Sequence, residues 1–196
     1  MEAMECLLGR QSTPAGSLVE PVPDDDEILN ILESAMRAPD HGALRPWRFL
    51  LIRGAARRRL GDLFADSLRR REPAAEAAEI EKARGKPLRA PLVMAIWAEI
   101  TEGIAKVPPV EQLVATAAAT QNMLNALHAK GYGAILVTGA PCYDEAVKAA
   151  LGLAAKDHLL GFVHIGTPNG TAAGKQRPAP AEFLREWHGP AELAAE

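Results

Sequence analysis

The chain has 196 residues, 48% of them hydrophobic, and a formal net charge of −3 at pH 7. This length and composition are sufficient for one sizeable core, so we expect residues 1–196 to form a single domain. The charge leaves no basic surplus, which argues against nucleic acid or an anionic membrane as the main partner. A small soluble ligand is expected instead.

The cysteines indicate a reducing compartment. Cys6 and Cys142 are too few for a disulfide framework, and neither belongs to a CxxC or Cys/His cluster that would hold a metal. Two glutamates precede a short apolar run at the N-terminus, which is unlike the charge order of a signal peptide. The longest apolar stretch, Pro91–Ala98, is too short to span a bilayer. We therefore expect a cytoplasmic protein without a membrane partner.

In the N-terminal half, caps and periodic apolar residues define alternating helices and strands. Residues 2–10 are predicted to form a short helix, and Asp24 with Glu27 three places on is a capping pair for a second helix that Pro39 stops. The segment Trp47–Ile52, which follows a loop rich in turn formers, predicts a strand. The pattern then predicts helices over 55–71 and 73–86.

In the C-terminal half, an alanine-rich pattern over Val110–Lys130 predicts the longest and most central helix. Strands are expected at Pro91–Ala98, which is apolar enough to be buried on both faces, and at Tyr132–Thr138 and Leu159–Thr167. A short helix is expected around 144–151. Residues 175–196 are expected to form an extended tail with a short helix at 181–187, because prolines precede it.

Several motifs that resemble known functional sites have simpler explanations. Gly131-Tyr132-Gly133 lacks both the preceding strand and the third glycine of a dinucleotide-binding fingerprint, since position 136 is leucine. The arginine triplets at 57–59 and 69–71 fan around a helix, which favours a solvated face over a nucleic-acid stripe. No histidine pair has metal-ligand spacing and no GxSxG elbow is present. Neither metal chemistry nor hydrolysis is predicted, and no metal ligand is expected.

The remaining candidates suit a planar cofactor that bears a phosphate. Arg10 and Ser12 follow the first predicted helix, and Arg37 and His41 precede the first strand. Arginine can donate two hydrogen bonds to a phosphate, and serine adds a hydroxyl donor. Taken alone, each arginine is more typical of an ordinary surface residue, and His41 is equally compatible with a loop capping role. Spacing does not decide between these alternatives.

One segment carries a specific resemblance. Residues Ser34–Phe49 have the sequence SAMRAPDHGALRPWRF, which resembles the APxxxxxxPWxF segment of the nitroreductase family, in particular a compact branch of it. Arg10-Gln11-Ser12 is similar to the N-terminal cofactor motif of that family. Further similar segments are Lys106-Val107-Pro108 with Glu111-Gln112, Gly161-Phe162 and Gly166-Thr167-Pro168. The resemblance extends over nearly the whole chain.

The resemblance implies an α+β fold with a central, mostly antiparallel sheet flanked by helices, forming an intertwined homodimer with FMN at the subunit interface. It implies that Arg10, Gln11 and Ser12 hold the phosphate and ribityl region, and that Arg37 and His41 contact the cofactor across the interface. Contacts near the flavin ring would come from Leu136, Val137 and Thr138. A nicotinamide contact would involve Ala126, Leu127, His128, Ala129, Lys130 and Gly131.

The chain departs from the family pattern at two places. Relatives often carry Trp-Arg-Ser where this chain has Leu136-Val137-Thr138, so the side-chain donor of the central arginine is absent. Gln11 replaces a basic residue, which weakens the positive field at the phosphate. We expect Lys175 and Arg177 in the tail to compensate.

The activity implied by the resemblance is that of an FMN-dependent NAD(P)H oxidoreductase with ping-pong hydride transfer through flavin N5. Expected acceptors are nitroaromatics, quinones or similar small molecules, and no protein residue is expected to be catalytic because the flavin carries the chemistry. One alternative is a flavin-dependent reductase or dehydrogenase of a specific metabolite, with loop Ile100–Pro109 setting specificity. Another is a flavin-binding or partner-binding dimer without turnover.

Overall fold

A computed structural model of the chain describes residues 2–170, 174, 176–187 and 189. Its helices are α1 (Ala3–Gly9), α2 (Asp25–Ala35), α3 (Ala55–Arg71), α4 (Ala77–Gly85), α5 (Pro109–Ala129) and α6 (Glu145–Ala150). Its strands are β1 (Leu18–Val19), β2 (Trp47–Ile52), β3 (Leu92–Ala98), β4 (Gly133–Val137) and β5 (His158–Pro168). Single 3-10 turns are η1 (Ala15–Ser17), η2 (His41–Ala43), η3 (Lys86–Leu88), η4 (Ala140–Tyr143) and η5 (Pro180–Glu182).

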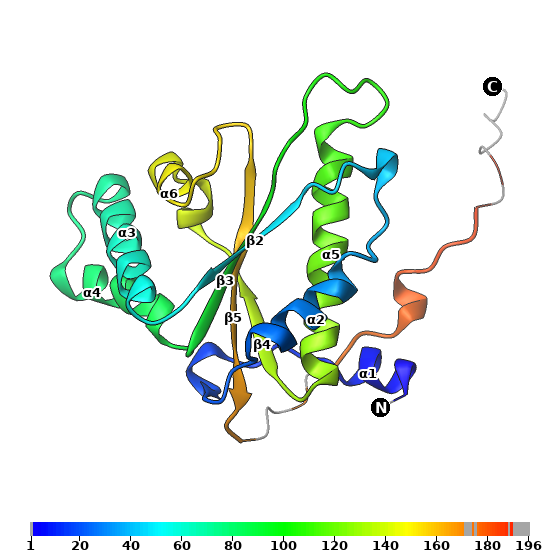
Figure 1. The fold of residues 1–196 in the computed structure, drawn as a ribbon, viewed down its shortest axis with the longest axis horizontal. Coiled ribbons are helices and arrows are strands. Elements are labelled where there is room, and N and C mark those ends of the chain that lie inside the picture. The colour runs from blue at the N-terminus through cyan, green and yellow to red at the C-terminus, as the bar shows by residue number, and fades with distance from the viewer. Residues whose placement is uncertain (1, 171–173, 175, 188, 190–196) are drawn as a thin grey trace, which may run out of the picture.

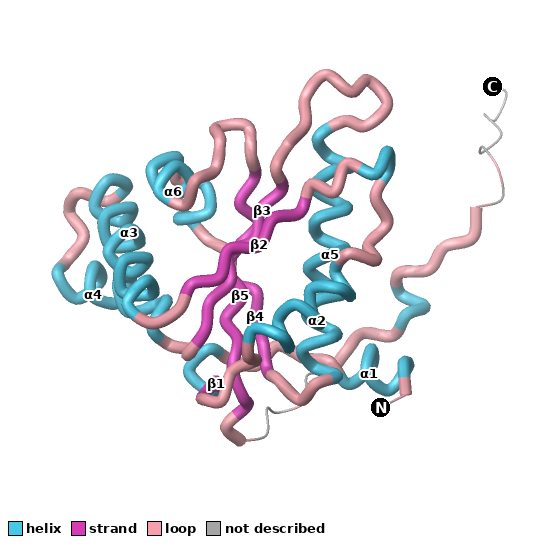
Figure 2. The backbone as a smooth tube through the Cα atoms, in the orientation of Figure 1, coloured by secondary structure: helices cyan, strands magenta, loops and turns pink. Residues whose placement is uncertain are grey.

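The strands form one sheet around β5 (Figure 2). β5 pairs with β3, β4 and β1, and β3 pairs with β2, each time in antiparallel register. The expected α+β class with an antiparallel sheet is confirmed. The two-residue strand β1 was not predicted, because so short a segment shows no alternating pattern.

Helices cover both faces of this sheet (Figure 1). α2 and α5 lie on one face, where Val163 and Ile165 of β5 join their apolar core. α3, α4 and α6 lie on the other, where Phe162 belongs to a second core. Because side chains alternate along a strand, residues 162 and 164 both point toward α3 and α4.

The start of α2 follows from its capping residues. The Asp24 carboxylate accepts a hydrogen bond from the Glu27 backbone N–H at 2.8 Å, and the Glu27 side chain accepts one from the Asp24 N–H at 3.3 Å. This reciprocal pair satisfies N–H groups that a helix N-terminus otherwise leaves free. The apolar face that follows, Ile28, Ile31 and Ala35, packs against α5. The cap thereby fixes where α2 enters the core.

α5 is the central helix, as its composition predicted. Ala115 and Ala119 are buried against the sheet, and their small side chains allow close approach. The side chain of Gln112 is also buried, and it accepts from the Thr101 N–H at 2.9 Å and donates to the Thr101 carbonyl at 2.8 Å. Gln112 therefore fastens the loop between β3 and α5 to the helix.

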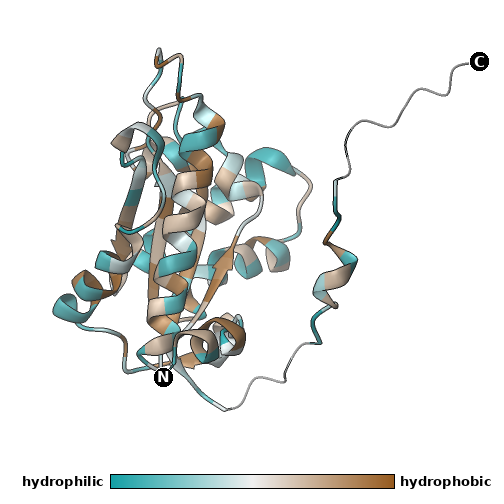
Figure 3. Cartoon of the chain, turned by 90° about the vertical axis from the view of Figure 1, so that its right-hand side faces the viewer, coloured by the Kyte–Doolittle hydropathy of each residue, from teal (hydrophilic) through white to brown (hydrophobic). Residues whose placement is uncertain are grey.

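The prediction for the tail was partly wrong. A helix was expected at 181–187, but only η5, Pro180–Glu182, is helical there. The apolar side chains of Phe183, Leu184 and Trp187 are 73–81% exposed, so this segment lacks the packing that a short helix requires. Figure 3 shows the segment leaving the body of the molecule. Lys175 lies outside the described residues.

Another boundary differed at α4. A helix was expected from residue 73, but it begins at Ala77. Glu76 and Glu79 form a capping box there, with the Glu79 carboxylate accepting from the Glu76 N–H at 3.0 Å. The cap, rather than the composition of the segment, sets the first residue of α4.

Candidate functional site

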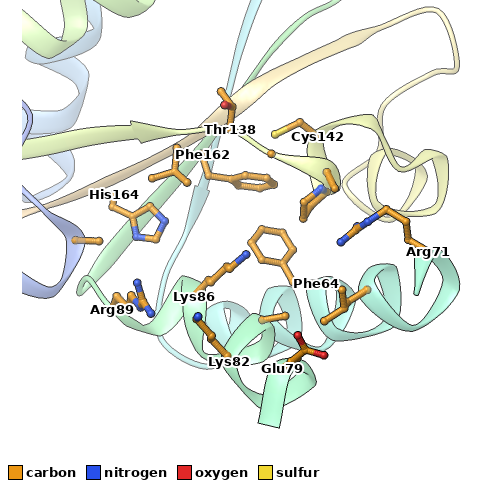
Figure 4. A pocket seen from close by; sticks show the side chains of 17 residues that line it. Phe64, Arg71, Glu79, Lys82, Lys86, Arg89, Thr138, Cys142, Phe162 and His164 are labelled. Carbon is orange, nitrogen blue, oxygen red and sulfur yellow. The ribbon is translucent and has the colours of Figure 1, made fainter. Parts of the chain in front are cut away.

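A cavity of about 430 Å³ lies between the sheet and the α3–α4 pair, at the C-terminal end of β4 (Figure 4). The end of β4 contributes Val137 and Thr138, and β5 contributes Phe162 and His164. Ala15 of η1 borders the same space. The other lining residues are Phe64, Leu68, Arg71, Glu79, Lys82, Ala83, Lys86, Arg89, Gly139, Ala140, Pro141 and Cys142.

Two aromatic rings shape one wall of this cavity. Phe64 of α3 and Phe162 of β5 make an edge-to-face contact, with ring centroids 5.0 Å apart and planes at 71°. Both side chains are buried, and this contact joins α3 to the sheet. Edge-to-face packing of this kind is favourable beyond the area that it buries. The wall is therefore apolar and rigid, which suits a planar ligand.

Four cationic side chains also line the cavity. Lys82, Lys86 and Arg89 come from α4 and the turn after it, and Arg71 comes from the end of α3. Glu79 is the one carboxylate among the described lining residues. Figure 4 shows the ammonium end of Lys86 directed toward the space beside Phe64 and His164. Such a lining favours a ligand with electron-rich or anionic groups.

His164 is the polar group buried most deeply in the cavity wall. Its side chain is 3% exposed, and Nδ1 has no hydrogen-bond partner among the described residues. Burial, together with the positive charge of Arg89, lowers the pKa of His164 to about 4. Its imidazole is therefore neutral at neutral pH, with one nitrogen that donates and one that accepts.

Cys142 also lines the cavity, but it is poorly suited to be a nucleophile. Burial raises the pKa of its thiol, and a backbone hydrogen bond from Gly139 opposes this only in part. Since the thiolate is the reactive form, the thiol stays protonated near neutral pH. The cavity thus shows the features of a binding site rather than of covalent catalysis.

The sequence-predicted ring contacts lie partly in this cavity. Val137 and Thr138 line it, whereas Leu136 packs against the opposite core between the sheet and α5. The chain after Arg10-Gln11-Ser12 runs along β4, since the Thr13 N–H donates to the Ala134 carbonyl at 3.0 Å. Ala15 then reaches the cavity. The candidate phosphate residues are therefore connected to the cavity by a short segment of backbone.

Arg37 and His41 lie elsewhere in the subunit. Arg37 follows α2, and His41 begins η2, beside the N-terminal turn of α5. The Nδ1 atom of His41 lies 2.6 Å from a carboxylate oxygen of Glu111. Neither residue lines the described cavity of its own subunit. Their expected contact with a cofactor across an interface stays a prediction.

The expected nicotinamide segment forms the C-terminal end of α5 and the turn after it. Leu127 is buried in the core, Lys130 caps the helix, and Gly131 has a positive φ of 86°. α1 packs beside this end, with Gly9 next to His128. Residues 126–131 do not belong to the described lining of the cavity. A nicotinamide role for this segment also stays a prediction.

Sequence reasoning missed the basic residues of α3, α4 and η3, and it missed His164. Arg71 had been assigned to a solvated face, yet it borders the cavity while it also pairs with Glu72 at 3.1 Å. One available signal was a histidine within the otherwise apolar run 159–165. The spacing of Lys82, Lys86 and Arg89 just before a buried strand was another.

Two further features of the structure bear on other classes of protein. Within the part of the chain that the structure describes, no helix is long and apolar enough to cross a bilayer. Histidines, cysteines and carboxylates in the described ranges do not gather in groups of three or more that could hold a metal ion.

Comparison with known proteins places the chain in a family. A family model described as the nitroreductase family matches residues 18–167. The chain is 37% identical over 187 residues to the "Putative NAD(P)H nitroreductase YdjA" of Escherichia coli K12, covering 94% of this chain and 98% of that protein. It is 32% identical to a "Putative NAD(P)H nitroreductase" of Haemophilus influenzae, covering 85% and 89%.

Solved structures show the same fold. A nitroreductase-like family protein from Bacillus cereus superposes with a TM-score of 0.81 at 22% identity, covering 96% of this chain and 97% of that one. A "putative nitroreductase in complex with fmn" from Desulfovibrio desulfuricans gives 0.70 at 24% identity, covering 95% and 97%. With most of its length matched by the family model and by close relatives, this chain belongs to the nitroreductase family of oxidoreductases.

Proposed function

We propose that the chain is an FMN-dependent NAD(P)H oxidoreductase that transfers hydride to a small acceptor by a ping-pong mechanism. The observation that supports this proposal most directly is the cavity. It is lined by Val137 and Thr138 and also by the basic residues of α4 and η3. The names of the relatives as NAD(P)H nitroreductases and the FMN complex of a structural neighbour support it.

The residues of the cavity suit a flavin. Its pyrimidine edge carries two carbonyl oxygens and gains negative charge on reduction, which matches the cations Lys82, Lys86 and Arg89. The buried imidazole of His164 borders the same cavity. Bound FMN supplies a centre that accepts hydride from a nicotinamide and passes it on. We propose that Arg10, Gln11 and Ser12 hold its phosphate and ribityl chain.

The chain's own residues would then bind and orient the cofactor and exclude water from it. The apolar wall formed by Phe64 and Phe162 limits solvent beside the cavity. Val137 offers backbone groups but no side-chain donor at a position where relatives often carry arginine. We propose that the cations on the opposite wall supply the positive charge instead. No dedicated acid or base is required by this scheme.

The proposed active unit is a homodimer. Arg37 and His41 lie outside the cavity of their own subunit, which is the arrangement expected if they complete the site of a second copy. The exposed apolar side chains of the tail also support a second subunit that covers them. A cytoplasmic location is proposed because Cys6 and Cys142 are free thiols.

Steady-state kinetics test the proposal. Initial rates measured at several NADPH or NADH concentrations against a nitroaromatic or a quinone are expected to give parallel double-reciprocal lines. Intersecting lines would contradict the ping-pong scheme. Absence of turnover with a broad panel of acceptors, despite bound flavin, would favour the flavin-binding dimer without turnover, which the valine at position 137 makes the second candidate.

A further inference from the structure

The loop between α2 and β2 is exposed and its backbone is strained. The side chains at 41, 43 and 45 are all exposed. Ala43 and Arg45 have positive φ values of 53° and 50°, a region that residues other than glycine seldom adopt. Such conformations persist only where the surroundings hold them, and they occur mainly at ligand-binding and catalytic sites. The strain therefore marks this loop as a candidate functional element.

Three contacts hold the loop in this conformation. The Asp40 carboxylate accepts a hydrogen bond from the Arg45 N–H at 2.6 Å, and the Arg48 guanidinium donates to the Arg45 carbonyl at 2.8 Å. Nδ1 of His41 lies 2.6 Å from a carboxylate oxygen of Glu111. Of these three contacts, the one between His41 and Glu111 joins the loop to α5, so it fixes the position of the imidazole relative to the body of the subunit.

The contact with Glu111 also sets how the ring of His41 is presented. An ionised carboxylate can only accept, so the hydrogen of this bond is carried by Nδ1. Nε2 lies on the opposite edge of the ring and is left for another partner. The side chain of His41 is still 57% exposed, so a second molecule can reach it. A hydrogen bond from a neighbouring side chain is the usual means of holding a binding residue in one rotamer.

We infer that Glu111 is a positioning residue for the cofactor site of a second copy of the chain. The inference rests on the proposed function, in which His41 contacts FMN across the subunit interface. Glu111 acts through His41 and holds the imidazole in the orientation that meets the bound cofactor. Because the ring is fixed before FMN arrives, less conformational entropy is lost on binding.

The test has to separate this role from a structural one. Glu111 lies in the first turn of α5, where a negative charge also stabilises the helix. A double-mutant cycle makes the separation, because a purely structural effect is the same with and without His41. Dissociation constants of FMN are measured by quenching of flavin fluorescence for wild type, Glu111→Ala, His41→Ala and the double variant.

The effects of the two substitutions are expected to be coupled. Glu111→Ala should weaken FMN binding about fivefold and His41→Ala about tenfold, the range that loss of one hydrogen bond produces. In the His41→Ala background, Glu111→Ala should change the affinity less than twofold. Glu111→Gln keeps an oxygen that accepts from Nδ1–H and should bind FMN within about twofold of wild type. Glu33→Ala, which removes an exposed carboxylate from α2, is the control and should bind as wild type does.

The possible failures can be told apart. Thermal unfolding and sedimentation of each variant show that folded proteins of the same assembly state are compared, and Glu111→Ser or His41→Phe replaces an alanine variant that does not fold. Wild-type FMN affinity in either single alanine variant, equal losses from Glu111→Ala with and without His41, or a glutamine variant as weak as Glu111→Ala would overturn the inference while the proposed function stands. If wild type binds no FMN, the proposed function itself fails.

Discussion

Burial of His164 links the stability of the protein to pH. Its pKa is about 4 in the folded chain, below the ordinary value of 6.5, so the unfolded chain binds a proton first as pH falls. This contribution to stability is intact above pH 6.5 and is lost between pH 6.5 and 4. We expect wild type to lose about 2–3 kcal/mol more than His164→Phe does between pH 7 and pH 4.5.

Urea unfolding of both proteins at the two pH values measures this difference. His158→Phe, which replaces an exposed histidine at the start of the same strand, serves as the control variant. An equal loss of stability in wild type and His164→Phe would show that the ring is protonated in the folded protein, and the lowered pKa of His164 would then be wrong.

Single residues of the site were predictable only where a motif marked them. The segment ending in Val137 and Thr138 was found through its resemblance to a family pattern, and the structure places both side chains in the cavity. Lys82, Lys86 and Arg89 belong to no motif, and each taken alone has the appearance of a surface residue. Their common direction arises from the packing of α4 on α3, which a single sequence does not reveal.

At the scale of elements, the contact between α3 and α4 positions the basic side of the cavity. Gly61 of α3 lies so close to the carbonyl oxygen of Arg84 that a Cβ atom there would overlap the backbone of α4. Gly61→Ala is expected to separate the helices, to cost about 1–3 kcal/mol, and to weaken FMN binding because Lys82 and Lys86 move with α4.

Gly85→Ala is the matched control for that variant. A Cβ atom at Gly85 meets nothing within 4 Å, and its φ of −73° is open to any residue. It should unfold at the same or a slightly higher urea concentration and bind FMN as wild type does. Wild-type stability and FMN affinity in Gly61→Ala would refute the role of this contact.

The elements with strong local signals were predicted closely. β2 and α3 have the expected bounds, and α5 begins and ends within one residue of its predicted range. Glycine or proline flanks both helices, with Gly54 before α3, Pro108 before α5 and Gly131 after it, and such residues mark helix ends in the sequence. The bounds of β1 and η5 were not predicted from local signals. β1 depends on pairing with a distant strand, and η5 is short because the residues after it are not packed against the rest of the chain. β1 exists because Leu18 and Val19 pair with the end of β5, about 150 residues later in the chain, and no local pattern encodes that pairing.

At the scale of the whole molecule, the tail gives a prediction about assembly. Phe183, Leu184 and Trp187 expose most of their apolar surface, which is a common feature of surfaces that another subunit covers. We expect a homodimer in solution, and we expect joint substitution of these residues by serine to raise its dissociation constant at least tenfold. Sedimentation velocity over a dilution series measures this effect.

A conservative control uses Leu29→Ser, which alters an exposed apolar residue on α2. Equal dissociation constants for the tail variant and wild type would exclude the tail from the interface. A wild-type monomer at all concentrations would contradict the dimeric site, and Arg37 and His41 would then have no route to the cofactor.

The central claim is that the cavity holds a flavin that a reduced nicotinamide can reduce. The most direct measurement is an anaerobic titration of the FMN-loaded protein with NADPH or NADH while the visible flavin band is followed. We predict that one equivalent bleaches the band and that a nitroaromatic or quinone then restores it. A protein that binds FMN but keeps its colour with both nucleotides, or one that binds no FMN, would contradict the account.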